Sequence, residues 1–187
     1  MNEATGVEQR FDRLLQSLEE RGIDVRFVQD RELALAAVLE IMEPGTAVAH
    51  GSSTTLQQIN VIDYLKGSDS PYRYLNTEWT AENDPDERSR LRGRLSLEAD
   101  YYLGSVQAIC EDGRVVGVDA TGSRQAFYVF GPSHVIWVTG VNKVVPDLEE
   151  AFSRIRTGAY PMENERMTDD GRNGSRIGKT VIYEHET

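Results

Sequence analysis

The sequence has very little cysteine, since Cys110 is the only one among 187 residues. A single thiol excludes an internal disulfide framework and any metal site built from several cysteines. Long apolar stretches are also missing, because no run approaches the roughly 18 to 20 residues that span a bilayer. The N-terminal stretch MNEATGVEQRFDRLL is polar and amphipathic and has no apolar core of the kind found in a secretory signal. We therefore expect a cytoplasmic protein that does not bind to membranes.

Lysine is scarce as well. Lys66, Lys143 and Lys179 are the only lysines, and the formal net charge is -11 at pH 7. A chain this negative is a poor general partner for nucleic acid or for an anionic membrane surface, because both carry negative charge themselves. An acidic, lysine-poor surface is typical of adaptation to salt. Codon bias explains the same composition equally well, and both explanations stay open.

The apolar pattern predicts one domain over residues 1–187 in which helices and strands alternate. Helices are expected at about 7–21, ended by Gly22, and at 32–42, 56–65 in one or two segments, 86–98 and 147–156. Strands are expected at 23–28, 46–49, 72–75, 101–103, 107–110, 115–118, 135–138 and 179–184. Segment 124–130 fits either a helix or a strand, and the chain from about 168 is expected to be an irregular tail. This alternation predicts an α/β fold with a mostly parallel sheet.

The helix expected at 86–98 carries four arginines at every second position, namely Arg88, Arg90, Arg92 and Arg94. A spacing of two spreads side chains around a helix and does not gather them on one face. We therefore expect these arginines to be solvated surface and not a site for a polyanion.

The first candidate site is the stretch His50, Gly51, Ser52, Ser53 and Thr54, which follows an expected strand and begins an expected helix. Glycine lets the backbone approach a ligand closely, and hydroxyls with free helix N–H groups can hold a phosphate or carboxylate. The stretch lacks the Gly-Lys-Ser ending of a P-loop. An ordinary serine or threonine N-cap with a structural histidine explains the same residues, so both interpretations stay open.

The second candidate is the acidic turn Glu111-Asp112-Gly113, directly after Cys110. A carboxylate held at the end of a strand can act as a general base or a nucleophile, which makes Glu111 the catalytic candidate. Asp112-Gly113 is also a strong hairpin signal, so a turn with solvated acids is the alternative. Cys110 is expected to face inward and to be unreactive.

Two further groups of candidate ligand-binding residues follow expected strands. Asp119 and Arg124 flank a Gly-Ser turn, where Arg124 could hold a carboxylate or phosphate through two hydrogen bonds, or could pair with Asp119. Asn142 and Lys143 come directly after the strand expected at 135–138. The sequence contains no HExxH, CxxC or EF-hand pattern and no assignable Ser-His-Asp arrangement. We therefore expect no metal site, and the sequence indicates no cofactor.

Several of these motifs together resemble the LUD-domain family, the lactate-utilization protein C-like proteins. The resemblance covers roughly residues 43–167 and depends on the order of GSSTTL (51–56), Ala99-Asp100, AICEDG (108–113), VDATGSR (118–124), FGP (130–132) and GVNKVV (140–145). It implies a three-layer α/β/α sandwich with a mainly parallel sheet, the fold shared by sugar-phosphate isomerases and CoA transferases. In that superfamily a glycine- and serine-rich loop holds a phosphate or acyl group, which implies this role for Gly51–Thr54. The Glu111 turn is similar to the Glu-Asn-Gly turn that carries the nucleophile of CoA transferases.

The resemblance implies a part in the oxidation of L-lactate to pyruvate, beside separate iron–sulfur proteins. A small anionic ligand would bind to Ser52, Ser53 and Thr54, with Arg124 or Lys143 supplying positive charge. A non-catalytic accessory or regulatory subunit is the alternative, and an isomerase- or transferase-like enzyme acting on a phosphorylated or CoA-linked substrate is a third. Whether the chain is an enzyme, and whether it forms a homo-oligomer, stay open.

This sequence departs from its relatives in three places. Gln107 stands where relatives usually have Asn, and Ser123 stands where a Gly-Asn pair is usual. Relatives of similar length often end in a cysteine-rich segment, whereas the stretch MTDDGRNGSRIGKT here contains no cysteine. We therefore expect no iron–sulfur cluster bound by this chain itself.

Overall fold

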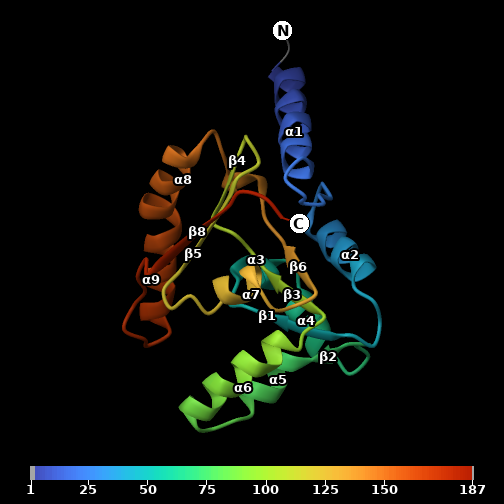
Figure 1. Ribbon diagram of the computed structural model, residues 1–187, viewed down its shortest axis with the longest axis vertical. Coiled ribbons are helices and arrows are strands. Elements are labelled where there is room, and N and C mark those ends of the chain that lie inside the picture. The colour runs from blue at the N-terminus through green and yellow to red at the C-terminus, as the bar shows by residue number, and fades with distance from the viewer. Residues whose placement is uncertain (1–2, 187) are drawn as a thin grey trace. The chain divides into compact units, whose positions relative to one another are not determined.

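The computed structural model describes residues 3–186, with side chains from Phe11 onward (Figure 1). The chain divides into two compact units, and each is assembled from segments that are not contiguous in sequence. The parallel-sheet unit comprises Phe27–Ser105 and Ser123–Thr139, and the mixed-sheet unit comprises Met1–Arg26, Val106–Gly122 and Gly140–Thr187. The boundary of a single domain over residues 1–187 stays a prediction, and Met1, Asn2 and Thr187 lie outside the described residues.

The parallel-sheet unit is built around four parallel strands. They are β1 (Ala47–His50), β2 (Arg73–Tyr74), β3 (Tyr101–Gly104) and β6 (His134–Trp137), in the order β2-β1-β3-β6. The register pairs Val48 with Tyr101 and Tyr101 with His134. Strands β1 and β3 are almost wholly buried, as expected for central strands of a parallel sheet. All carboxyl ends therefore meet at one edge, where His50 and the following loop lie.

Helices cover both faces of this sheet. They are α2 (Arg31–Ile41), α3 (Thr54–Gln58), α4 (Val61–Lys66), α5 (Leu75–Thr80), α6 (Pro85–Leu97) and α7 (Gln125–Val129). Val48, Tyr101 and Leu103 pack in one apolar cluster with residues of α2, α3 and α4. Tyr102 points to the other face, where its ring lies 5.1 Å from Phe127 and 5.9 Å from the ring of Tyr128 in α7. The predicted α/β fold with three layers is confirmed.

The mixed-sheet unit begins with α1 (Glu3–Glu19) and contains β4 (Ala108–Cys110), β5 (Val115–Asp119), β7 (Val144–Val145) and β8 (Lys179–Tyr183), in the order β7-β4-β5-β8. Strand β4 is parallel to β7, whereas β5 is antiparallel to both of its neighbours. Across the two sheets most pairings are parallel, as predicted. The antiparallel pairing of β4 with β5 arises because the short turn after Cys110 returns the chain at once.

A continuous helical stretch packs on β4 in this unit. It consists of α8 (Leu148–Arg154), a π-helical turn (Ile155–Ala159) and α9 (Tyr160–Asp169). Asp147 caps its start by accepting a hydrogen bond from the Glu150 N–H. Ala151 and Ile155 are buried against Val116 and other strand residues, which gives the unit its own apolar core.

Three local predictions from the sequence were wrong. Segment 23–28 is irregular and not a strand. Alternating apolar residues indicate which side of a segment would be buried, but a strand also needs a neighbouring strand to bond its backbone groups. The predicted strand at 72–75 is only two residues long, and Leu75 already belongs to α5. The helical stretch runs on to Asp169, and Pro161 lies just after the π-helical turn Ile155–Ala159, where the backbone hydrogen-bond pattern changes. Among the described residues, no helix is both long and apolar enough to cross a membrane.

Gly104 gives a test of the packing on β3. A Cβ at this position would lie 1.6 Å from the Tyr128 hydroxyl oxygen, which accepts a hydrogen bond from the Ser105 N–H at 3.0 Å. We expect Gly104→Ala to lower the free energy of unfolding by about 3 kcal/mol, because the Tyr128 ring must leave this site. Urea unfolding measures the change. Gly158→Ala is the control, since nothing lies within 4 Å of its added carbon. Equal midpoints for the two variants would contradict this account.

Candidate functional site

The loop after β1 is shaped by the side chain of Arg124. A Cβ at Gly51 would lie 2.5 Å from Cγ and 2.6 Å from Cδ of Arg124, so the arginine stem crosses the backbone directly at the glycine. Its Nη1 then donates a hydrogen bond to the Ser52 carbonyl at 3.0 Å. Gly51 donates its own N–H to the Leu103 carbonyl, which ties the loop to β3. The structure thus brings together Arg124 and the Gly-Ser loop, two candidates that are 72 positions apart in sequence.

The hydroxyls of the loop have different roles. Ser53 is the N-cap of α3, and its Oγ accepts a hydrogen bond from the Leu56 N–H at 3.3 Å. Ser52 and Thr54 are exposed. The N-cap alternative therefore applies to Ser53, while Ser52 and Thr54 are exposed and the Arg124 guanidinium lies at the Ser52 carbonyl.

Both ring nitrogens of His50 lie within hydrogen-bond distance of a partner. Nδ1 lies 2.8 Å from the Gly51 carbonyl and Nε2 lies 2.7 Å from the Tyr74 hydroxyl, whose ring is stacked on the imidazole. A carbonyl can only accept, so Nδ1 carries the hydrogen and Nε2 accepts from Tyr74. Burial lowers the pKa of His50, and burial raises the pKa of Tyr74 to about 12. A neutral imidazole at neutral pH therefore orients the loop, while direct contact of His50 with a ligand stays a prediction.

Asn76 is a supporting residue that sequence reasoning missed. Its side-chain oxygen accepts from the His50 N–H at 3.0 Å, and its amide donates to the His50 carbonyl at 3.1 Å. The two hydrogen bonds of the Asn76 side chain thus satisfy the backbone of His50, at the end of β1, beyond the point where the short strand β2 ends. The signal in the sequence is weak, because a lone asparagine inside a short helix usually faces solvent.

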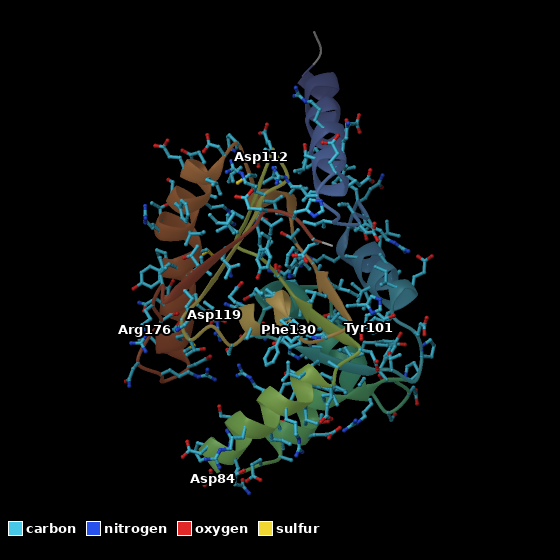
Figure 2. All side chains as sticks on the ribbon, in the orientation of Figure 1. Asp84, Tyr101, Asp112, Asp119, Phe130 and Arg176 are labelled. Carbon is cyan, nitrogen blue, oxygen red and sulfur yellow. The ribbon has the colours of Figure 1, made fainter. Side chains whose placement is uncertain are left out.

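The candidates of the mixed-sheet unit lie at two ends of its sheet. Asn142 and Lys143 precede β7, which is parallel to β4, and Asp119 ends β5, which is antiparallel to β4. All three therefore lie where β4 begins, whereas Glu111 lies where β4 ends. At about 3.3 Å per residue, the level of Glu111 along the strands is about 10 Å from that of Lys143 and about 20 Å from that of Asp119. Figure 2 shows Asp119 and Asp112, the neighbour of Glu111, at opposite ends of this sheet. Asp119, Asn142 and Lys143 thus lie toward one end of this sheet, and Glu111 lies toward the other.

Glu111 begins the tight hairpin that was the alternative interpretation of its motif. The Cys110 N–H donates to the Arg114 carbonyl at 2.8 Å, and Gly113 has a φ of +85° that favours glycine. Although burial opposes ionisation of Asp112, hydrogen bonds from Arg114 lower the pKa of this carboxyl. Burial raises the pKa of the Cys110 thiol to about 11, so the cysteine is protonated and unreactive at neutral pH.

Asp119 is buried, with 8% of its surface exposed, and lies opposite Lys179 in the β5–β8 ladder. Its carboxylate accepts from the Thr121 N–H at 3.4 Å, and its carbonyl accepts from the Gly178 N–H at 3.1 Å. The residue therefore holds the turn that follows β5. Among the described residues, no group of three or more His, Cys, Asp and Glu side chains is arranged to hold a metal ion.

Comparison with known families decides the identity of this fold. A family model described as "LUD domain" matches residues 11–181, almost the whole chain. The chain belongs to the LUD-domain family. The match extends the predicted resemblance at both ends, into α1 and β8, and the LUD domain connects the protein to lactate utilization in general terms. No curated protein and no solved structure matches the chain.

Arg154 is a residue of the LUD-domain chain whose role the sequence did not reveal. Its Nη1 donates to the Gln107 carbonyl at 2.5 Å and its Nε donates to the Asn142 carbonyl at 3.1 Å. Burial lowers the pKa of this guanidinium, which still stays charged at neutral pH. Arg154 therefore clamps the segment before Lys143 against the start of β4. Its position beside the buried Ala151 and Ile155 was the available signal.

The ring of His50 makes the stability of this LUD-domain protein depend on pH. Because the folded chain holds the pKa of His50 below 6.5, the unfolded chain binds more protons just below that pH. The contribution of His50 to the free energy of unfolding is therefore largest above pH 6.5, and it decreases as the pH drops toward the lowered pKa. We expect the stability difference between wild type and His50→Gln, measured by urea unfolding, to shrink from about pH 7.5 to about pH 5.5. Nitrogen-15 NMR should show the hydrogen on Nδ1. A ring protonated on Nε2, or a difference that grows as pH falls, contradicts the geometry.

Replacing Arg154 tests its clamp. We expect Arg154→Met to lower the free energy of unfolding by about 2 to 3 kcal/mol, because two backbone carbonyls lose their charged donor. Arg156→Met is the matched control. Arg156 is exposed, with its guanidinium 5.8 Å from the Phe152 ring, and its loss should cost less than about 1 kcal/mol. Urea unfolding of both variants measures the difference, and equal losses would show that the clamp contributes nothing.

Proposed function

We propose that this LUD-domain protein takes part in the oxidation of L-lactate to pyruvate by binding a small carboxylate at the loop after β1. The observation that carries the proposal is the guanidinium of Arg124, which is held at the Gly51–Ser52 backbone. A guanidinium donates in parallel to both oxygens of a carboxylate, and lactate and pyruvate each carry one such group.

The surroundings of Arg124 favour an anion at this loop. The whole chain carries a net charge of -11, so an anionic ligand needs a local source of positive charge. The exposed hydroxyls of Ser52 and Thr54 add neutral donors beside it. In the mixed-sheet unit, Asp119, Asn142 and Lys143 stay predicted ligand-binding residues and Glu111 a predicted acid or base, and binding at the loop does not depend on them.

A second candidate function is a non-catalytic accessory or regulatory subunit. The position of Glu111 favours it, because this carboxylate lies at the other end of its sheet from Asp119 and Lys143. The ring nitrogens of His50 are also engaged within the chain. Oxidation of lactate releases a pair of electrons, and one cysteine cannot supply the ligands of an iron–sulfur cluster. In this form of the proposal, iron–sulfur partner subunits accept the electrons while this chain binds the substrate or product.

Isothermal titration calorimetry tests the binding proposal. Wild-type protein should bind L-lactate or pyruvate, and Arg124→Ala should weaken that binding about 10- to 100-fold, because charge-assisted hydrogen bonds are lost. Arg31→Ala, which removes the same charge from an exposed site in the same unit, should bind as wild type does.

Inorganic phosphate and CoA are titrated in parallel. Tighter binding of either one than of lactate and pyruvate would favour a phosphorylated or CoA-linked substrate instead. No heat from any ligand in folded protein, or unchanged binding by Arg124→Ala, would overturn the proposal.

Growth on lactate separates the enzyme from the accessory subunit. In cells that lack the native copy, Glu111→Gln and Lys143→Ala should abolish growth if this chain performs acid–base chemistry. If both variants support growth while Arg124→Ala does not, the chain binds a ligand for a partner that carries out the oxidation.

A further inference from the structure

An exposed apolar cluster lies on the parallel-sheet unit at the junction of α6 and α7. Phe130 is 82% exposed, Val129 is 61% exposed and Leu97 is 52% exposed. A Cβ at Gly131 would lie 2.6 Å from Cδ2 of Leu97, so the segment after α7 rests directly on the last turn of α6. Figure 2 shows Phe130 on this part of the unit. Large apolar side chains that gather in this way mark an interaction surface more often than single exposed residues do.

The cluster continues into a charged stripe along α6. Arg90, Arg94 and Leu97 follow one another at spacings of four and three residues, so they lie on one face of the helix. Leu95 and Ser96 are buried on the opposite side. A groove of about 410 Å³ extends the stripe and is lined by Glu82, Glu87, Arg90, Leu91 and Arg94.

Packing within the chain does not explain why position 93 of α6 is a glycine. Glycine in a helix interior costs about 1 kcal/mol relative to alanine. Nothing lies within 4 Å of the place where its Cβ would be, and its φ is not positive. Gly93 lies three residues after Arg90 and four before Leu97, at the edge of the same stripe. A bare backbone at this point allows another chain to approach α6 closely.

We propose that this surface, formed by the exposed face of α6 and the end of α7, binds the same surface of a second copy of the chain. The stripe carries both signs of charge, since Glu87 and Glu98 border Arg90 and Arg94. A purely acidic partner would meet two of its own charges there. With a two-fold axis level with residue 96, the last turns of the two α6 helices meet antiparallel and Arg94 of each copy lies opposite Glu98 of the other.

This pairing is self-complementary in its apolar part as well. Leu97, Val129 and Phe130 of the two copies form the centre, and the ion pairs form the rim, which is the usual arrangement of a protein interface. Within one chain Arg94 and Glu98 are 3.8 Å apart, with 69% and 50% of their side chains exposed. Such a loose exposed pair is readily exchanged for one across the axis.

Light scattering after size-exclusion chromatography tests the proposal at physiological salt. Wild type should have twice the monomer mass of 21.0 kDa. Phe130→Asp and Leu97→Asp should each raise the dissociation constant about 30-fold or more, because an anchor is lost from both halves of the interface. Met162→Asp, at a residue 72% exposed in the other unit, is the matched control and should leave the dimer intact. Circular dichroism confirms folding of each variant.

Charge reversal tests the predicted ion pairs between copies. R94E alone and E98R alone should each weaken the dimer several-fold, since like charges then face each other. An equimolar mixture of the two variants should recover a dimer of wild-type strength, because opposite charges meet again across the axis. An effect inside one chain cannot produce this recovery. A monomeric wild type, a dimer unchanged by Phe130→Asp and Leu97→Asp, or no recovery on mixing would overturn the proposal.

Discussion

The contact between the Arg124 stem and Gly51 determines what the loop after β1 can do. Any side chain at position 51 would occupy the space that Cγ and Cδ of the arginine fill. The glycine thus lets a long cationic side chain cross the end of a buried parallel strand and reach the Ser52 carbonyl. His50 holds the same backbone through the hydrogen bond between its Nδ1 and the Gly51 carbonyl. The loop thus combines two exposed hydroxyl residues with one guanidinium, a set of donors that fits the proposed carboxylate ligand.

Arginine performs in this chain a task that lysine cannot perform. Arg21 donates to the carbonyls of Asp112 and Glu184, and Arg154 donates to those of Gln107 and Asn142. Each guanidinium joins two backbone segments that are distant in sequence, because its planar fork presents several donors in set directions. An ammonium group on a flexible stem would not hold two carbonyls in this geometry. At these two positions arginine therefore has a structural role, while salt adaptation and codon bias both stay open as explanations of the composition.

The sequence predicted those parts of the fold in which local pattern and burial agree. The apolar runs at 46–49 and 101–103 are buried on both faces as central strands, so the residues of each run are enough to predict a buried strand. Segment 23–28 carries an equally clear alternation but has no strand beside it, and pairing is decided far along the chain. The same limit applies to sites. Gly51 and Arg124 were recognisable separately, whereas the contact of His50 with Tyr74 exists only because β1 pairs with β2.

The position of Glu111 bears on how the family's chemistry is divided. The residues Glu111-Asp112-Gly113 form a short hairpin turn, in which the Asp112 carboxylate accepts a hydrogen bond from Arg114. The cation, the hydroxyls and the ordered backbone all belong to the loop after β1, in the other unit. A carboxylate can be bound there without an acid or base, because binding needs only charge and donors in place. Removing a hydride or a proton from lactate needs more than that. In the proposed function, the groups of the loop would therefore serve to recognise a carboxylate, and the acid or base that oxidation needs would have to come from elsewhere.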